Sequence, residues 1–274
     1  MYNRKLVLES GKEFVGISFG SSKEVLAKIT FNTSVVGYQE ILSDPANYRE
    51  IICMTYPVVG NYGLNDEDYE SKGLVVSGLV VRDYNELPSN FRYTHKLSEA
   101  MEENEVSGIA GIDTRELTRY IRDNGSMKAM ICDINKPLEQ CLAEIRAYDE
   151  EKDIISSVST KKVSYSRTHN PNFNVVVVDC GVNKSLIKGL NKVGYNVVIV
   201  PYNTSLDQII KFKADGLVIP NTCTNEDLAY KLALRSLKGT ELDILASNTV
   251  LRFLTRAYLL KNGYKENQIF NFLM

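Results

Sequence analysis

The sequence predicts an α/β protein of two domains, and three observations support this fold class. Up to about residue 150, short apolar runs typical of strands outnumber helical patterns. From residue 173 onward, strand and helix patterns alternate strictly, which is typical of a parallel sheet with helices on both faces. Between these regions, residues 151–172 are polar and rich in Ser, Thr, Lys and Asn, as expected of a linker. The expected domains therefore cover residues 1–150 and 173–274.

The composition is that of an ordinary globular protein. Its 274 residues are 44% hydrophobic and 24% charged, and the formal net charge is −2. This balance gives no electrostatic reason to expect a nucleic acid or an anionic membrane as partner. No apolar run approaches the ~20 residues of a membrane span, and the first residues lack the apolar core of a signal peptide. We therefore expect a cytoplasmic protein that binds neither nucleic acid nor membrane.

Strand patterns dominate the first domain, and capping residues mark its clearest helix. Strands are expected over Lys5–Leu8, Glu13–Phe19, Val25–Phe31, Glu50–Thr55, Gly73–Val81 and Met127–Cys132, and helices over Lys96–Asn104, Asp113–Asp123 and Pro137–Tyr148. Ser10-Gly11 predicts a hairpin between the first two strands. Asp113 can cap its helix, Glu116 follows three residues later as in a capping box, and Gly125 ends the helix.

The second domain alternates regularly between the two kinds of element. Strands are expected over Asn174–Asp179, Asn196–Val200, Gly216–Ile219 and Leu242–Leu245, and helices over Asn183–Val193, Leu206–Phe212, Asn225–Leu237 and Val250–Leu260. In such a sheet, the carboxyl end of a strand that leads into a helix is the favoured place for chemistry. Ser247-Asn248-Thr249 forms such a turn, but its apex is Asn248, which is no nucleophile. Helix capping is therefore the favoured interpretation of this turn.

The cysteines and histidines form no recognisable catalytic pattern. The five cysteines are widely separated without a C-x-x-C pair, so a zinc or redox motif is not expected, and the odd count suggests reduced thiols. Cys180 follows a strand and Cys223 lies in a loop; burial is favoured for the first over a reactive thiolate. The two histidines, His95 and His169, are interpreted as surface residues. Because Asp179–Asn183 lacks the G-x-G-x-x-G pattern and no metal motif occurs, we expect no cofactor and no metal.

Four segments of the first domain closely resemble the small subunit of carbamoyl phosphate synthetase. They are FNTSVVGYQEILSDP (31–45), MTYPVVGNYGLND (54–66), GLVVRDYNELPSNFR (78–92) and GIAGIDTRELTRYIRDNGSMKA (108–129). More faintly, VVVVDCGVNKSLIKGLNKVGYNVVIVPYNTSLDQI resembles the opening of that subunit's class I glutamine amidotransferase domain, which implies a flavodoxin-like sheet. The family's complete subunit hydrolyses glutamine with a Cys-His-Glu triad. It passes ammonia to a large subunit that uses ATP and bicarbonate to make carbamoyl phosphate.

The chain departs from the family pattern where the resemblance implies catalysis. The nucleophile elbow G-I-C-L-G-H-Q is matched by Ala246–Arg252, in which Asn248 replaces the cysteine and an amide cannot form a thioester. Val250 replaces a glycine of the sharp elbow, and Arg252 replaces a glutamine that contacts substrate. No catalytic residue is therefore expected.

The remaining pocket residues are expected to be vestigial. The S-N-G-P-G loop is replaced by Pro220–Thr224 without its glycines, and no histidine follows His169. Ser34 matches a serine that reaches the glutamine pocket from the first domain. The vestigial pocket would contain Ser34, Thr222, Thr224, Thr249 and Arg252.

Three hypotheses follow for the function. The first is a truncated, degenerate small-subunit homologue without glutaminase activity that acts as a binding or scaffolding partner of a large subunit. The second is a non-hydrolytic subunit that supports ammonia-dependent carbamoyl phosphate synthesis, in the pyrimidine or arginine pathway. The third is a free-standing sensor that binds a small anion near Arg252. A shortened sheet would also leave an apolar edge unpaired, which favours self-association.

Overall fold

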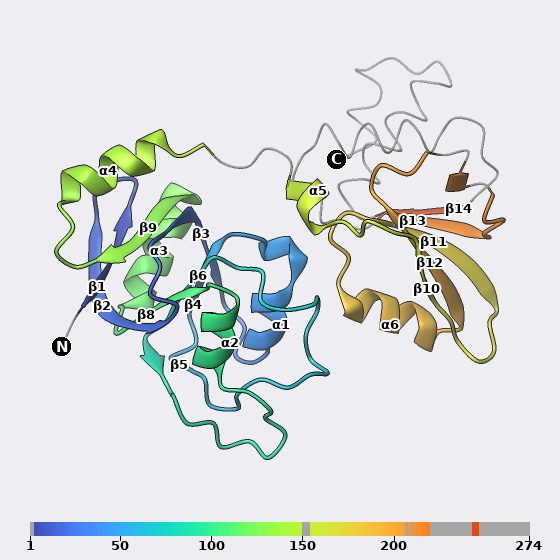
Figure 1. The fold of residues 1–274 in the computed structure, drawn as a ribbon, viewed down its shortest axis with the longest axis horizontal. Helices are drawn as coiled ribbons and strands as arrows, with labels where there is room; N and C mark the ends of the chain where they lie inside the picture. Colours follow the sequence, from blue (N-terminus) through green and yellow to red (C-terminus); the bar gives the residue numbers. More distant parts are fainter. Residues whose placement is uncertain (1–2, 150–153, 206–207, 210, 220–242, 247–274) are drawn as a thin grey trace. The chain divides into compact units, whose positions relative to one another are not determined.

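The computed structural model describes residues 3–149, 154–205, 208–209, 211–219 and 243–246. The chain divides into two compact units, Met1–Lys152 and Asp153–Met274. Figure 1 shows the elements of both units.

The first unit is built on a closed seven-stranded barrel with the order β1-β2-β8-β6-β4-β3-β9. Its strands are β1 (Arg4–Leu8), β2 (Glu13–Gly20), β3 (Val25–Asn32), β4 (Ile51–Met54), β6 (Gly78–Val80), β8 (Ser107–Ala110) and β9 (Met127–Asp133). The β3-β4, β4-β6 and β6-β8 pairs are parallel, whereas the other four pairs are antiparallel. Beside the barrel, β5 (Val58–Val59) and β7 (Asp83–Tyr84) form a two-stranded parallel sheet.

Local sequence explains the two best-marked features of this unit. The expected hairpin joins β1 and β2, with Leu6 opposite Phe14, and Gly11 takes a positive φ of 86° at the turn. The helix α3 (Thr114–Asn124) begins where Asp113 accepts the backbone N–H groups of residues 115 and 116, and it ends at Gly125. Both predictions are confirmed.

Alternation along the strands divides the apolar residues between the inside and the outside of the barrel. One buried cluster draws on all seven strands and on α3, and it includes Leu6, Ile29 and Ile109. A second cluster packs alternate strand residues such as Leu79 against α1 (Tyr38–Ser43) and α2 (Leu97–Glu103). The helix α4 (Leu138–Ala147) lies along β1 and β9 (Figure 1) and covers a third cluster. A short 3₁₀ helix, Pro45–Asn47, follows α1.

The sequence did not predict β8 or the closure of the barrel. The strand β8 is short and contains Gly108, at which a Cβ atom would lie 2.7 Å from the ring of Phe19. A glycine inside a strand weakens its local signal, although here it permits the close approach of that ring. The strand expected over Gly73–Val81 is also shorter, since only Gly78–Val80 belongs to β6.

The second unit contains a five-stranded sheet with the order β10-β12-β11-β13-β14. Its strands are β10 (Ser164–Ser166), β11 (Phe173–Asp179), β12 (Tyr195–Pro201), β13 (Gly216–Ile219) and β14 (Asp243–Ala246). The last four are parallel to one another, as the sequence predicts. The helix α6 (Lys184–Lys192), capped by Asn183, packs an apolar stripe against this sheet. The helix expected over Leu206–Phe212 lies partly outside the described residues, and those over Asn225–Leu237 and Val250–Leu260 lie wholly outside them.

The stretch expected as a linker contains regular structure. The helix α5 (Ile154–Val158) lies within it, and β10 pairs antiparallel with β12, so that Tyr165 is opposite Val198. Polar composition hid this strand because it carries alternating serines at the edge of the sheet. The exact limits of the two domains stay a prediction.

Candidate functional site

The carboxyl edge of the parallel sheet is where the sequence places most candidate residues. Ile219 at the end of β13 pairs with Ala246 at the end of β14, so the segments that follow these strands begin side by side. The strand β11 reaches the same edge, because Val177 pairs with Val218. Thr222 and Thr224 belong to the first segment, and Asn248, Thr249 and Arg252 to the second. All five lie outside the described residues, so their roles stay predictions.

At the end of β11, a buried carboxylate organises the turn into α6. Asp179 is only 8% exposed, and its Oδ1 accepts the backbone N–H groups of Gly181 and Val182 at 3.0 and 2.9 Å. Its Oδ2 accepts the N–H of Thr160 at 2.7 Å. Three donors on one carboxylate satisfy a charge that would otherwise be costly to bury. Asp179 therefore has a structural role and joins the turn to residues that precede the sheet.

Cys180 lies in the same turn but is only 1% exposed. Its interpretation as a buried residue after a strand is confirmed, because a sulfur without access to solvent cannot reach a substrate in this conformation.

Ser34 is the only candidate of the vestigial pocket that the structure describes. It lies on the exposed loop between β3 and α1, and its backbone N–H donates to Asn32 Oδ1 at 2.8 Å. The next two residues, Val35 and Val36, are 62% and 71% exposed. They line a small, largely apolar cavity of about 100 Å³ together with Tyr38, Met54, Tyr56, Val58, Val59, Asn61 and Tyr62. The loop thus presents a hydroxyl beside apolar surface, without a base among its described contacts.

A pair of tyrosines holds the base of this loop. The rings of Tyr38 and Tyr62 stack with centroids 4.1 Å apart. The hydroxyl of Tyr62 accepts the N–H groups of Gly37 and Tyr38, each at 2.9 Å, while the hydroxyl of Tyr38 donates to the carbonyl of Gly63 at 2.8 Å. Burial raises the pKa of both phenols, so both stay protonated at neutral pH. Their role is to position the loop rather than to exchange protons.

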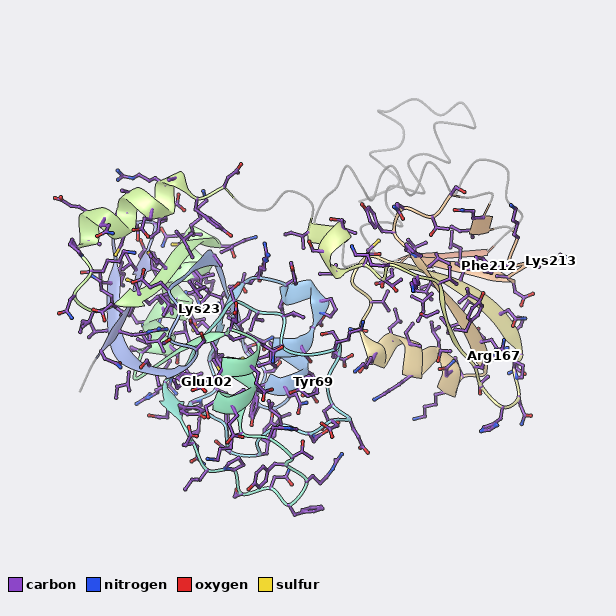
Figure 2. All side chains as sticks on the ribbon, in the orientation of Figure 1. Lys23, Tyr69, Glu102, Arg167, Phe212 and Lys213 are labelled. Carbon is purple, nitrogen blue, oxygen red and sulfur yellow. The ribbon has the colours of Figure 1, made fainter. Side chains whose placement is uncertain are left out.

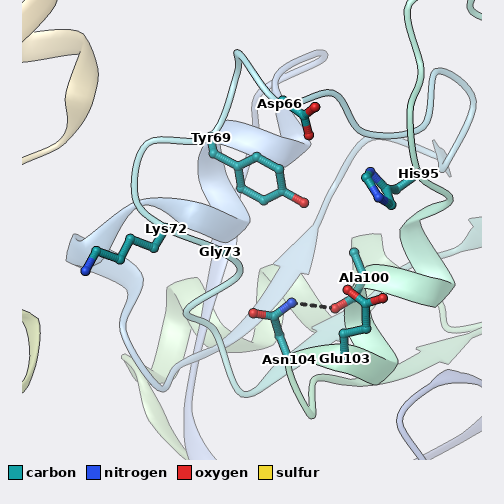
Figure 3. A pocket seen from close by; sticks show the side chains of 8 residues that line it. All are labelled: Asp66, Tyr69, Lys72, Gly73, His95, Ala100, Glu103 and Asn104. Atoms are coloured by element: carbon teal, nitrogen blue, oxygen red, sulfur yellow. Dashed lines mark hydrogen bonds between the residues drawn. The ribbon is translucent and has the colours of Figure 1, made fainter.

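His95 lies at a polar hollow of about 360 Å³ on the first unit (Figure 3). Asp66, Tyr69 and Glu103 line the same hollow, and Asn104 uses its amide to donate to the carbonyl of Ala100 at 2.7 Å. The Nδ1 atom of His95 contacts Thr94 Oγ1 at 2.9 Å. His95 is exposed, as is His169, which confirms that both are surface residues. The side chains that line the hollow are mostly charged or polar.

The described part of the chain contains no group of three or more His, Cys, Asp or Glu side chains arranged to hold a metal ion. Within that same part, no helix is both long and apolar enough to cross a bilayer. The cysteines among the described residues are all buried and form no disulfide there (side chains of both units are drawn in Figure 2).

Comparison with known proteins identifies the family. Residues 6–131 match the model of the carbamoyl-phosphate synthase small chain, CPSase domain, and residues 176–241 match that of glutamine amidotransferase class-I. The carbamoyl phosphate synthase pyrimidine-specific small chain of Halalkalibacterium halodurans is 38% identical over 238 residues, which are 86% of this chain and 65% of that protein. This chain belongs to the carbamoyl phosphate synthase small-chain family.

Two further small chains agree with this result. The carbamoyl phosphate synthase small chain of Listeria innocua is 41% identical over 221 residues, which are 81% of this chain and 60% of the relative. That of Fusobacterium nucleatum is 38% identical over 221 residues, or 81% of this chain and 61% of the relative. The chain thus spans less than two thirds of the length of these small chains.

The family matches cover the two parts of the candidate site unequally. The small-chain match includes Ser34 and the tyrosine pair, whereas the amidotransferase match ends at residue 241, before β14 and Asn248. The correspondence between Asn248 and a family nucleophile stays a prediction. Sequence reasoning missed the tyrosine pair, because no local pattern connects Tyr38 with Tyr62. It also overlooked the role of Asp179, although aspartate is a known turn residue whose side chain accepts the backbone N–H two residues further on.

Proposed function

We propose that this chain is a small-subunit-type binding partner of a carbamoyl phosphate synthase large subunit, and that it does not hydrolyse glutamine. The observation that carries the second part is the amide at position 248. The resemblance aligns Asn248 with the cysteine of the nucleophile elbow, and it follows β14 by two residues. A carboxamide is neutral and weakly nucleophilic at neutral pH, so it cannot form the thioester that the family reaction requires.

Neighbouring substitutions support the loss of hydrolysis. Val250 stands where the elbow needs a residue without Cβ, and Pro220–Thr224 carries no glycine that would let backbone N–H groups approach a substrate. These changes affect the nucleophile, the geometry of its turn and the loop that approaches substrate, so reversing one of them is not expected to restore activity.

The first unit supports the binding part of the proposal. Its barrel is closed, its core is continuous across all seven strands, and its loop at Ser34 is held by the tyrosine pair. Exposed Val35 and Val36 also give it apolar surface of the kind that protein interfaces cover.

Two measurements test the proposal. The purified chain, alone and mixed with the large subunit of the same organism, is assayed for glutamate release from glutamine; we expect none, for the native chain and for Asn248→Cys alike. Asn248→Ala is the matched control for an effect of the substitution itself. Glutamate release by the native chain at a rate above that of Asn248→Ala would overturn the loss of hydrolysis.

The partner is tested separately. Co-expression with the large subunit should give a complex that survives size-exclusion chromatography. With ammonia as the nitrogen source, the complex should also form carbamoyl phosphate at a rate that differs from the rate of the large subunit alone. If the two chains elute apart and the ammonia-dependent rate is unaltered, the binding role is wrong even when hydrolysis is absent.

A further inference from the structure

Two cysteine thiols face each other between the barrel and α4. The Sγ atoms of Cys132 in β9 and Cys141 in α4 are 3.6 Å apart, and both residues are 0% exposed. They belong to the small apolar cluster under α4, which also contains Val7, Met130 and Ile145. Neither residue has a part in the proposed binding function. The pair is therefore a separate feature of the molecule.

The arrangement is specific to this pair among the described cysteines. Cys53, which is equally buried, has the hydroxyl of Thr118 at 4.0 Å as its polar contact. For Cys132 and Cys141, by contrast, each sulfur is the hydrogen-bonding partner of the other. A disulfide needs its sulfurs about 2.05 Å apart, so the two atoms must approach by about 1.6 Å, which small side-chain rotations and a slight shift of α4 can supply.

We propose that Cys132 and Cys141 form a site of reversible oxidation, in which a peroxide converts the two thiols into a disulfide that ties α4 to β9. In the first step, one thiolate attacks a peroxide oxygen, the O–O bond breaks, and a sulfenic acid and hydroxide form. In the second, the sulfur of the other thiol attacks the sulfenic sulfur; its S–H bond and the S–O bond break, one S–S bond forms, and the oxygen leaves as water. Overall, two thiols and one hydrogen peroxide give one disulfide and two waters.

Burial sets the rate of this reaction. It raises the pKa of the Cys132 thiol to about 12, which the neighbouring Cys141 reinforces and the nearby ammonium of Lys5 opposes. Few thiolates are present in the closed state at neutral pH, so oxidation proceeds mainly when α4 opens from the barrel. Once formed, the disulfide ties α4 to β9 and so prevents the helix from opening again. It would act as a covalent staple on the last helix of the first unit.

The sequence provides a direct readout. Trypsin cleaves after Lys128 and Arg146 but not between Lys136 and Pro137, so peptide 129–146 contains both cysteines of the pair and no other. Peptide 50–72 contains Cys53 alone and is the matched control for a buried thiol without a thiol neighbour. The folded full chain is treated with hydrogen peroxide, quenched, alkylated with iodoacetamide in denaturant and digested without a reductant.

We expect peptide 129–146 to lose both labels and to become two hydrogens lighter, and to regain both labels after dithiothreitol. Peptide 50–72 should stay labelled. In Cys132→Ser and Cys141→Ser variants, peptide 129–146 should not form the internal bond. Retention of both labels on peptide 129–146 of the native chain, at peroxide doses that oxidise other cysteines, would overturn the proposal. So would cross-linking of either thiol to another peptide as the main product.

Discussion

The tyrosine pair under the Ser34 loop provides the sharpest test of how this chain holds its candidate site. Tyr62→Phe removes one hydroxyl and leaves the ring in place, so the stacking with Tyr38 at 4.1 Å can persist. What disappears is the acceptor that binds the N–H groups of Gly37 and Tyr38, each at 2.9 Å. The substitution therefore isolates two hydrogen bonds from the packing around them.

The size of the effect follows from these contacts. A backbone donor that loses its only acceptor away from water costs about 1–3 kcal/mol. Tyr38 is 4% exposed and Gly37 is half-buried, so we expect a combined loss of about 2 kcal/mol. For a unit of about 150 residues this lowers the Tm by roughly 4–8 °C.

Thermal unfolding of the full chain and hydrogen exchange of the peptide that carries residues 37 and 38 measure the effect. The amides of both residues should exchange faster in Tyr62→Phe than in the native chain, because their acceptor is gone. Tyr56→Phe is the matched control. It removes a hydroxyl from a tyrosine that is 37% exposed at the same cavity, and it should change stability by less than about 0.5 kcal/mol. Equal Tm and equal exchange in the two variants would refute the assigned role of the Tyr62 hydroxyl.

Three further predictions concern stability and are measured by urea unfolding. Asp179→Ala should lower the free energy of unfolding by at least about 2 kcal/mol, because three backbone donors lose a buried, charged acceptor. An unchanged urea midpoint would contradict this. Gly189→Ala should raise the free energy of unfolding by about 0.5–1 kcal/mol, because alanine favours the helix more than glycine does and the added Cβ meets nothing within 4 Å in α6. A lower urea midpoint would contradict this. The hydrogen bond from Lys136, together with Gln140 and Coulombic attraction, holds the pKa of Glu144 below its usual value. Its stabilising contribution is thus present above the unfolded pKa and is lost as the pH falls through the lower folded value. The difference in the free energy of unfolding between the native protein and Glu144→Gln should become smaller as the pH falls. A difference that does not change with pH would refute this linkage.

The sequence predicted those elements whose structure depends on residues close together in the chain. The hairpin at Ser10-Gly11 and the start of α3 at Asp113 were predicted because turn and cap chemistry act over a few residues. The four parallel strands of the second unit were predicted because β-rich apolar runs alternate with helical patterns. The prediction of a linker over residues 151–172 was wrong at β10 because the local sequence of this edge strand is polar. Only its pairing with β12 identifies it as a strand.

For the candidate site, the structure describes the strands that lead into it and Ser34, and the roles of its residues stay predictions. The parallel strand pairing from Gly216–Asp243 to Ile219–Ala246 places the starts of the two candidate segments together, as the order of elements had indicated. The contacts that support the Ser34 loop were not predictable, because Tyr62 lies 24 residues from Tyr38 and nothing between them announces the pairing.

The sequence by itself determined the hairpin at Ser10-Gly11, the helix start at Asp113, the family resemblance and the amide at position 248, because each of these depends on residue identity or on neighbours along the chain. Only the tertiary structure decided that seven strands close into a barrel and that Tyr62 holds the loop at Ser34. It alone also brought Cys132 and Cys141 within 3.6 Å of each other, by placing α4 over β9. These features depend on which surfaces meet after the chain has collapsed, and burial and register select that outcome among many pairings that the local patterns equally allow.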